Sequence, residues 1–143
     1  LGAMGRLRLQ PDVITCSAAI SACGECGQWQ RSLDVASSMG TLRIAPDIAS
    51  YGVLLDAVFD RPVMWSAFCD AWDSGAFPML SNCQAWHLDL HELSAGAAVV
   101  AVQRHLSRIA ASNPATVGGN PKLRIVTGWG KSRRDHKDSV VKA

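Results

Sequence analysis

The segment HLDLHELS, residues 87–94, places an aspartate two positions before a histidine within an apolar stretch. The carboxylate of Asp89 and the imidazole of His91 are groups that transfer protons or hold a divalent cation near neutral pH. Apolar and polar residues alternate here, which predicts a short strand with both groups on one face. Leu88 and Leu90 then lie on the other face. The pair is therefore either a working acid–base couple or the polar side of a strand that leads into a helix.

The segment TGWGKSRR, residues 127–134, carries a second set of candidate groups. A turn through Gly128 and Gly130 offers backbone N–H groups to a phosphate, and Trp129 offers a ring for stacking on an unpaired base. Three cations follow the turn and can contact a phosphate backbone: Lys131, Arg133 and Arg134. The alternative is an ordinary glycine turn with a core aromatic residue and a solvated basic tail.

The elements around these two segments are expected to bring them together. Ser94 is predicted to cap a helix over residues 95–112. A buried strand over 123–126 is expected after the loop at 113–121. A strand–helix–strand unit of this kind makes its strands parallel, so both carboxyl ends lie at one edge, where open α/β sheets bind ligands. The face of the helix that is expected to be buried carries Val99, Val102, Leu106 and Ile109.

The first half of the chain contains an internal repeat. MGRLRLQPDVIT at 4–15 aligns without a gap with MGTLRIAPDIAS at 39–50, an offset of 35 residues. Each unit predicts two helices, with Asp12 as the first cap and with Gly24, Gly27 and Gly40 as breaks. The expected helices span residues 13–24, 28–39 and 48–59 and the segment between Pro62 and Gly75.

A helical pair with this offset, opened by PDVIT and containing ISACG, resembles the pentatricopeptide repeat (PPR) family. The resemblance covers residues 1–75: the end of one repeat, a full repeat over 11–45 and a divergent one over 46–75. Tetratricopeptide repeats fit less well, because their period is about 34 residues and the Pro-Asp pair here precedes the first helix. One repeat cannot bury its face alone, so the chain is expected to be the C-terminal part of a longer array.

The PPR resemblance implies single-stranded RNA binding at about one base per repeat. It assigns base reading to the fifth residue counted from Val13 and to the last residue of that unit, which are Ser17 and Asp47. In the family, a small hydroxyl with an aspartate is associated with guanine. The second unit has Gly52 at the first reading position, which leaves no side chain to read with. Alternatively, Ser17 is only a small helix residue and Asp47 only the next helix cap.

LDLH at the first strand and TGWGKS after the second resemble the small MutS-related (SMR) domain, an α/β sandwich that pairs L-D-x-H with T/H-G-x-G. Members bind nucleic acid, and several are nicking or RNA endonucleases. The resemblance makes Asp89 and His91 the candidate catalytic residues, and Thr127, Gly128 and Gly130 fall on the glycine motif. Two departures are Glu92, where the family often has glycine, and the short C-terminal end DSVVKA.

Composition limits these interpretations. The chain has 143 residues, 48% of them hydrophobic, and its longest apolar runs are too short to span a bilayer. Residues 1–86 hold 5 basic and 8 acidic side chains, whereas residues 87–143 hold 9 and 4, so the second half is the one suited to an anion. Cys23 and Cys26 have C-x-x-C spacing, but no second pair of zinc ligands follows, which favours reduced structural thiols.

The expected architecture is therefore α + α/β: a PPR solenoid segment over 1–75, a linker over 76–86 and a C-terminally incomplete SMR sandwich over 87–143. Because PPR–SMR fusions are organelle proteins, the resemblance implies a plastid or mitochondrial protein that binds single-stranded RNA, with DNA as a further partner of the SMR domain. That domain would bind or cleave the backbone, with Mg²⁺ involved only in a nuclease and no other cofactor or membrane expected. Two alternatives stay open: a non-catalytic RNA-binding adaptor, and a protein–protein scaffold with an inactive SMR domain.

Overall fold

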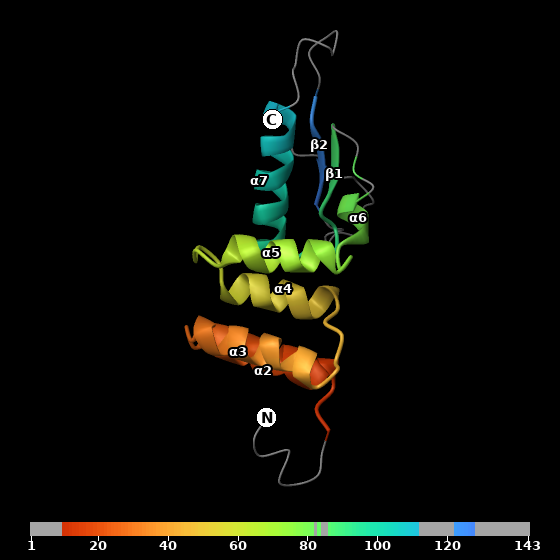
Figure 1. The fold of residues 1–143 in the computed structure, drawn as a ribbon. Coiled ribbons are helices and arrows are strands. Elements are labelled where there is room, and N and C mark those ends of the chain that lie inside the picture. The colour runs from red at the N-terminus through yellow and green to blue at the C-terminus, as the bar shows by residue number, and fades with distance from the viewer. Residues whose placement is uncertain (1–9, 82, 84–85, 112–121, 128–143) are drawn as a thin grey trace, which may run out of the picture.

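Two helical pairs stack below a longer helix and a two-stranded sheet (Figure 1). The computed structural model describes residues 10–81, 83, 86–111 and 122–127. The chain is mostly helical, and its elements are α2 (Val13–Glu25), α3 (Trp29–Thr41), α4 (Ile48–Ala57), α5 (Met64–Asp73), the short α6 (Pro78–Ser81), β1 (His87–Asp89), α7 (Ala95–Ala111) and β2 (Arg124–Val126).

The repeat in the sequence is a repeat in local structure. Asp12 accepts a hydrogen bond from the backbone N–H of Thr15 at 2.8 Å, and Asp47 accepts one from Ser50 at 2.8 Å. Each aspartate thus satisfies a backbone donor that the first turn of its helix leaves unpaired. The predicted pair of helices in each unit is confirmed, with boundaries that shift by one or two residues.

Two of the expected glycine breaks are wrong. Gly24 lies inside α2, where a Cβ atom would stand 2.7 Å from the Cβ of Ala57, so glycine allows α2 and α4 to approach closely. Gly40 lies inside α3, and the left-handed turn after that helix falls on Arg43, whose φ is 58°. The N–H of Ile44 then bonds the carbonyl of Met39 at 2.9 Å, which closes the helix end.

The segment expected as a linker takes part in the core. It contains α6, and Phe77 and Leu80 are only 2% and 3% exposed. The Phe77 ring stacks on Phe68 of α5 at 5.7 Å between centroids. Leu88 of β1 and Val100 of α7 belong to the same buried cluster, so one hydrophobic core runs from the helical pairs into the sheet.

The predicted buried face of α7 is wrong in part, because only Val102 of its predicted residues packs against the buried cluster. Val99 and Leu106 are 38% and 48% exposed. The buried residues are instead Gly96, Ala97, Val100, Ala101 and His105. Small residues face inward because α7 begins directly against α4: a Cβ at position 96 would lie 2.7 Å from the carbonyl oxygen of Leu55.

This close approach makes Gly96→Ala destabilising. The new methyl group would overlap the α4 backbone, and we expect the free energy of unfolding to fall by about 1–3 kcal/mol. Gly40→Ala is the matched control, because outside the backbone of its own helix no atom of the described residues lies within 4 Å of the place that its methyl group would occupy. That change should be neutral or stabilising by up to about 1 kcal/mol through helix propensity. Urea unfolding of both variants measures the difference, and equal effects would contradict the close packing of α7 on α4.

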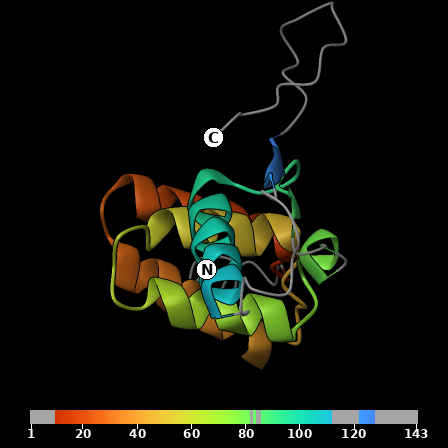
Figure 2. The same cartoon turned by 90° about the horizontal axis from the view of Figure 1, so that it is seen from above.

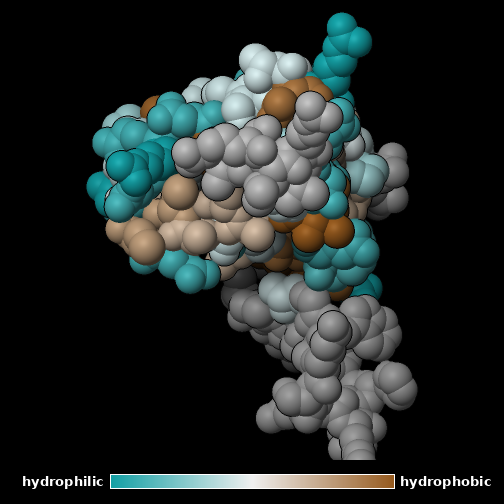
Figure 3. Space-filling view, turned by 90° about the horizontal axis from the view of Figure 1, so that it is seen from below, coloured by the Kyte–Doolittle hydropathy of each residue, from teal (hydrophilic) through white to brown (hydrophobic). Residues whose placement is uncertain are grey.

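The end of the stack formed by α2 and α3 exposes apolar surface. Figure 3 views this end and shows hydrophobic residues that reach the surface beside hydrophilic ones. Ile14 of α2 is 74% exposed and Leu42, which follows α3, is 45% exposed. Among the helices of the described residues, none is long and apolar enough to cross a membrane.

Candidate nucleic-acid interface

The two strands place their ends at one edge of the sheet. β1 and β2 are parallel, with Asp89 beside Val126, which confirms the orientation expected from the strand–helix–strand order. The N–H of Leu90 bonds the carbonyl of Val126 at 2.8 Å and extends the pairing past the last strand residue. Thr127 therefore leaves the sheet at the edge where His91 leaves it. The other candidates after β2 lie outside the described residues: Gly128, Trp129, Gly130, Lys131, Arg133 and Arg134.

One carboxylate oxygen of Asp89 makes two contacts with His91. Its Oδ1 accepts the backbone N–H of His91 at 3.1 Å and lies 2.7 Å from the ring Nδ1. The first contact is a turn that aspartate side chains commonly form with the residue two positions later. The second fixes the orientation of the imidazole ring. The two residues expected to work as a pair are therefore in direct contact.

The contact with Asp89 determines which ring nitrogen of His91 can react. A neutral imidazole that donates from Nδ1 to the carboxylate carries its lone pair on Nε2. The His91 side chain is 35% exposed, so Nε2 can be reached from solvent. Oε1 of Glu92 lies 3.5 Å from Nε2 and competes with a ligand for the protonated ring.

Asp89 shifts the protonation equilibrium of His91. The hydrogen bond to the Asp89 side chain, aided by the charges of Asp89 and Glu92, outweighs the opposing effect of burial and raises the pKa of His91 above 6.5. Burial raises the pKa of Asp89, but its bonds to the His91 side chain and backbone outweigh this and lower it below 3.8. The contribution of His91 to stability is lost as pH rises through its raised pKa. That of Asp89 is lost as pH falls through its lowered pKa.

Removing the carboxylate is expected to return the pKa of His91 towards its ordinary value. In Asp89→Asn we expect a fall of the His91 midpoint, because both the charge and the strongest hydrogen bond to the protonated ring are lost. Glu92→Gln should lower the His91 midpoint by a smaller amount. Asp73→Asn, which changes an exposed aspartate at the end of α5, should leave the midpoint unchanged. An NMR titration of the ring protons measures all three, and an unchanged midpoint in Asp89→Asn would contradict the pairing.

The structure also brings together the two residues expected to read a base. The Oγ of Ser17 lies 2.9 Å from the Oγ of Ser50, which donates to Asp47 Oδ1 at 2.7 Å. The Ser17 hydroxyl also lies 2.8 Å from the carbonyl of Val13, to which it can donate, so its single proton is directed either to that carbonyl or to Ser50. Bonds from the Ser50 backbone and hydroxyl lower the pKa of Asp47, which keeps it ionised. Ser50 was not predicted, although it aligns with Thr15 as the third residue after a capping aspartate.

The contacts between the helical repeat and the sheet edge were not predictable from any local pattern. Asp56 of α4 accepts the backbone N–H of Gly96 at 2.6 Å, and Ser94 Oγ donates to the carbonyl of Gly52 at 3.0 Å. Ser94 also caps α7 as expected, since its Oγ accepts the N–H of Ala97 at 3.3 Å. The loop that carries His91 is therefore tied to α4 at two points.

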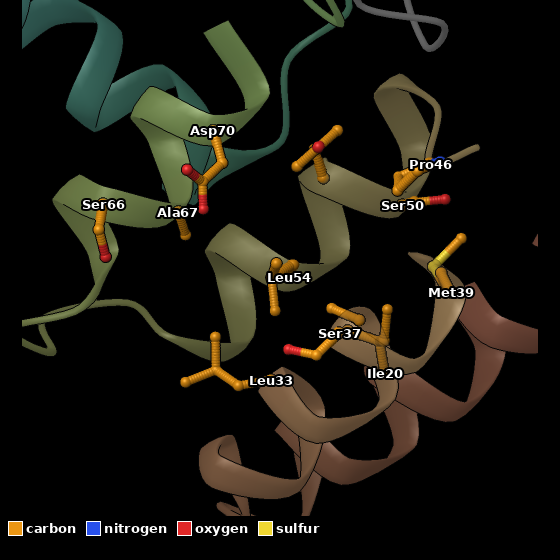
Figure 4. A pocket seen from close by; sticks show the side chains of 12 residues that line it. Ile20, Leu33, Ser37, Met39, Pro46, Ser50, Leu54, Ser66, Ala67 and Asp70 are labelled. Carbon is orange, nitrogen blue, oxygen red and sulfur yellow. The ribbon is translucent and has the colours of Figure 1, made fainter. Parts of the chain in front are cut away.

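A sizeable hollow in the described part of the chain lies away from the sheet edge. A cavity of about 180 Å³ opens between α3, α4 and α5, with Leu33 and Leu54 on its apolar wall and Asp70 at its rim (Figure 4). Neither Asp89 nor His91 lines it. Cys23 and Cys26 are free thiols at the end of α2, and the described residues contain no group of three potential metal ligands.

Comparisons with known proteins give no family for this chain. No protein-family model matches it, and no curated protein matches it either. Its function is therefore inferred from the residues at the sheet edge and on the repeat helices.

Proposed function

We propose that the protein binds single-stranded RNA along its helical repeats and holds or cuts the RNA backbone at the Asp89–His91 edge. The observation that carries this proposal is the 2.7 Å contact that orients the His91 ring, with Nε2 accessible at the end of a parallel strand. The resemblance of the repeat to PPR units and of LDLH and TGWG to the SMR motifs supports RNA as the ligand. The same resemblance would place the protein in a plastid or mitochondrion.

The oriented histidine can cleave RNA by acid–base chemistry. Neutral His91 would take the proton of a ribose 2′-hydroxyl on Nε2 while the 2′-oxygen attacks the phosphorus atom. Asp89 would stabilise the imidazolium that forms. As the bond from phosphorus to the 5′-oxygen breaks, Nε2 would return the proton to that oxygen, which leaves a 2′,3′-cyclic phosphate and a 5′-hydroxyl. The Oδ1 of Asp89 already accepts two hydrogen bonds, which favours its orienting role over the holding of Mg²⁺.

The repeat would select the base. Ionised Asp47 can only accept hydrogen bonds, which suits the amino and ring N–H groups of guanine. Because the Ser17 proton is directed to the Val13 carbonyl or to Ser50, the Ser17 oxygen is a second acceptor beside Asp47. Because residues 1–86 hold more acidic than basic side chains, most of the electrostatic affinity would come from the basic second half.

The test is a binding and cleavage assay with labelled single-stranded RNA and Mg²⁺, using the whole chain and an Asp89→Ala/His91→Ala variant. We expect the parent chain to bind with an affinity that falls steeply with salt and to cleave, and the variant to bind without cleaving. An absence of RNA binding by both proteins would contradict the proposal and favour a protein–protein scaffold.

The second candidate is a non-catalytic RNA-binding adaptor. It is favoured by Glu92, whose carboxylate lies 3.5 Å from Nε2 and repels a phosphate at the place where the reaction would occur. Binding by both proteins of the assay without cleavage would select this function. In that case Glu92→Gln should bind RNA more tightly than the parent chain, because a negative charge at the phosphate site is removed.

A further inference from the structure

The second repeat unit has no base-reading side chain on α4, and Ser94 occupies the place where that side chain would lie. Ser17 on α2 has Ser50 of α4, the first helix of the next unit, as its neighbour, at 2.9 Å between hydroxyl oxygens. Gly52 stands at the matching position of α4 and has Ser94 as its neighbour: a Cβ added at Gly52 would lie 3.4 Å from the Cβ of Ser94. Ser94 therefore fills the space where a reading side chain of the second unit would stand.

His91 lies close to this closed position. It precedes Ser94 by three residues, a separation of at most about 10 Å even in a fully extended chain. A turn shortens the loop further, since the N–H of Leu93 bonds the carbonyl of Leu90 at 3.1 Å. Packed helices such as α2 and α4 lie about 8–10 Å apart. His91 therefore lies beside the layer of Gly52, and a phosphate held at His91 is one that flanks the nucleotide whose base lies at Gly52, at one base per repeat.

The sheet edge also lies on the side of the molecule that carries the base-reading positions. Figure 2 shows β2 on the side of α2 and α4, whereas α3 and α5 lie on the opposite side. A strand that passes the reading positions of α2 and α4 would therefore continue towards His91 without crossing a helical pair. The 2.6 Å bond from Gly96 to Asp56 fixes the start of α7, and with it the loop, on α4.

We infer that the phosphate held at His91 belongs to the nucleotide immediately next to the one whose base lies at Ser17 and Asp47. This inference rests on the proposed function and adds the register between base and phosphate. Base selection by the repeat would then determine which phosphodiester is held or cut, with Asp56 and Ser94 as positioning residues. The nucleotide at Gly52, whose base no side chain reads, is then the one whose phosphate lies at His91.

The register can be tested with the full chain and short RNAs that contain one guanosine in a cytidine strand. A single 4-thiouridine is placed at each position around the guanosine, and crosslinked peptides are identified by mass spectrometry, together with any cleavage products. We expect the peptide containing His91 to crosslink only when the 4-thiouridine adjoins the guanosine. Moving the guanosine along the strand should move the crosslink and any cleavage by the same number of nucleotides.

The outcomes separate this inference from the proposed function. The register would be overturned if the RNA binds but the His91 peptide crosslinks two or more nucleotides from the guanosine. It would also be overturned if the crosslink does not move when the guanosine is moved. RNA binding itself would stand in both cases. A complete lack of RNA binding would overturn both. In Asp56→Ala the crosslinks should spread over at least two further positions while the preference for guanosine is kept, because the loop loses its tie to α4. Asp73→Asn is the control and should keep the single position.

Discussion

Replacing Phe68 by alanine is expected to lower the free energy of unfolding by about 3–5 kcal/mol, a large part of the stability of a domain this size. Phe68 is fully buried, and its ring packs against Phe77 at 5.7 Å and Trp72 at 6.3 Å. These contacts join α5 to the segment before the sheet, so the loss should weaken the helical pairs and the sheet region together. Urea unfolding measures the size of the effect.

Phe59→Ala is the matched control, since the same side chain is removed at a position that is 48% exposed. Its effect should stay within about 0.5 kcal/mol. Hydrogen exchange distinguishes a shared core from two independent ones. In Phe68→Ala the slowest amides of α4 and α7 should lose protection by similar factors. Protection lost in α4 alone would show that the repeat and the sheet region unfold separately.

The second large effect is expected on RNA cleavage. If the protein is a nuclease, His91→Gln should lower the cleavage rate by about 10²–10⁴-fold, because the general base is removed, while RNA affinity changes little. His87→Gln, at the start of the same strand, serves as the control and should keep most of the rate. Single-turnover cleavage and a separate binding titration measure the two quantities. An unchanged rate in His91→Gln would exclude His91 as the base.

The pH dependence of cleavage follows from the raised pKa of His91. The reaction needs the neutral ring, so the rate should rise with pH through that pKa and level off above it. Glu92→Gln removes a charge that raises the pKa of His91, so the midpoint should move to lower pH. Asp89→Asn should shift it further in the same direction and also lower the plateau, because the ring loses its orientation. A midpoint that stays in place in both variants would contradict this account.

Features with local causes could be predicted from the sequence. The caps at Asp12 and Asp47 and the paired helices follow from hydrogen bonding and periodicity within short segments, and the parallel strands follow from the strand–helix–strand order. The contact of Asp89 with His91 spans two residues and is of the same kind. The predicted end of α3 was wrong, because the residue that adopts the left-handed conformation after the helix is Arg43 and not Gly40.

By itself the sequence determined the repeat, the order of elements and the pairing of Asp89 with His91, since each depends on residues close together in the chain. Only the tertiary structure decided which face of α7 is buried, because the approach to Leu55 at the start of the helix leaves room for no side chain at Gly96. The burial of Phe77 and the bond from Gly96 to Asp56 were decided in the same way. Contacts between distant segments depend on shape complementarity across the whole core, which no short pattern records.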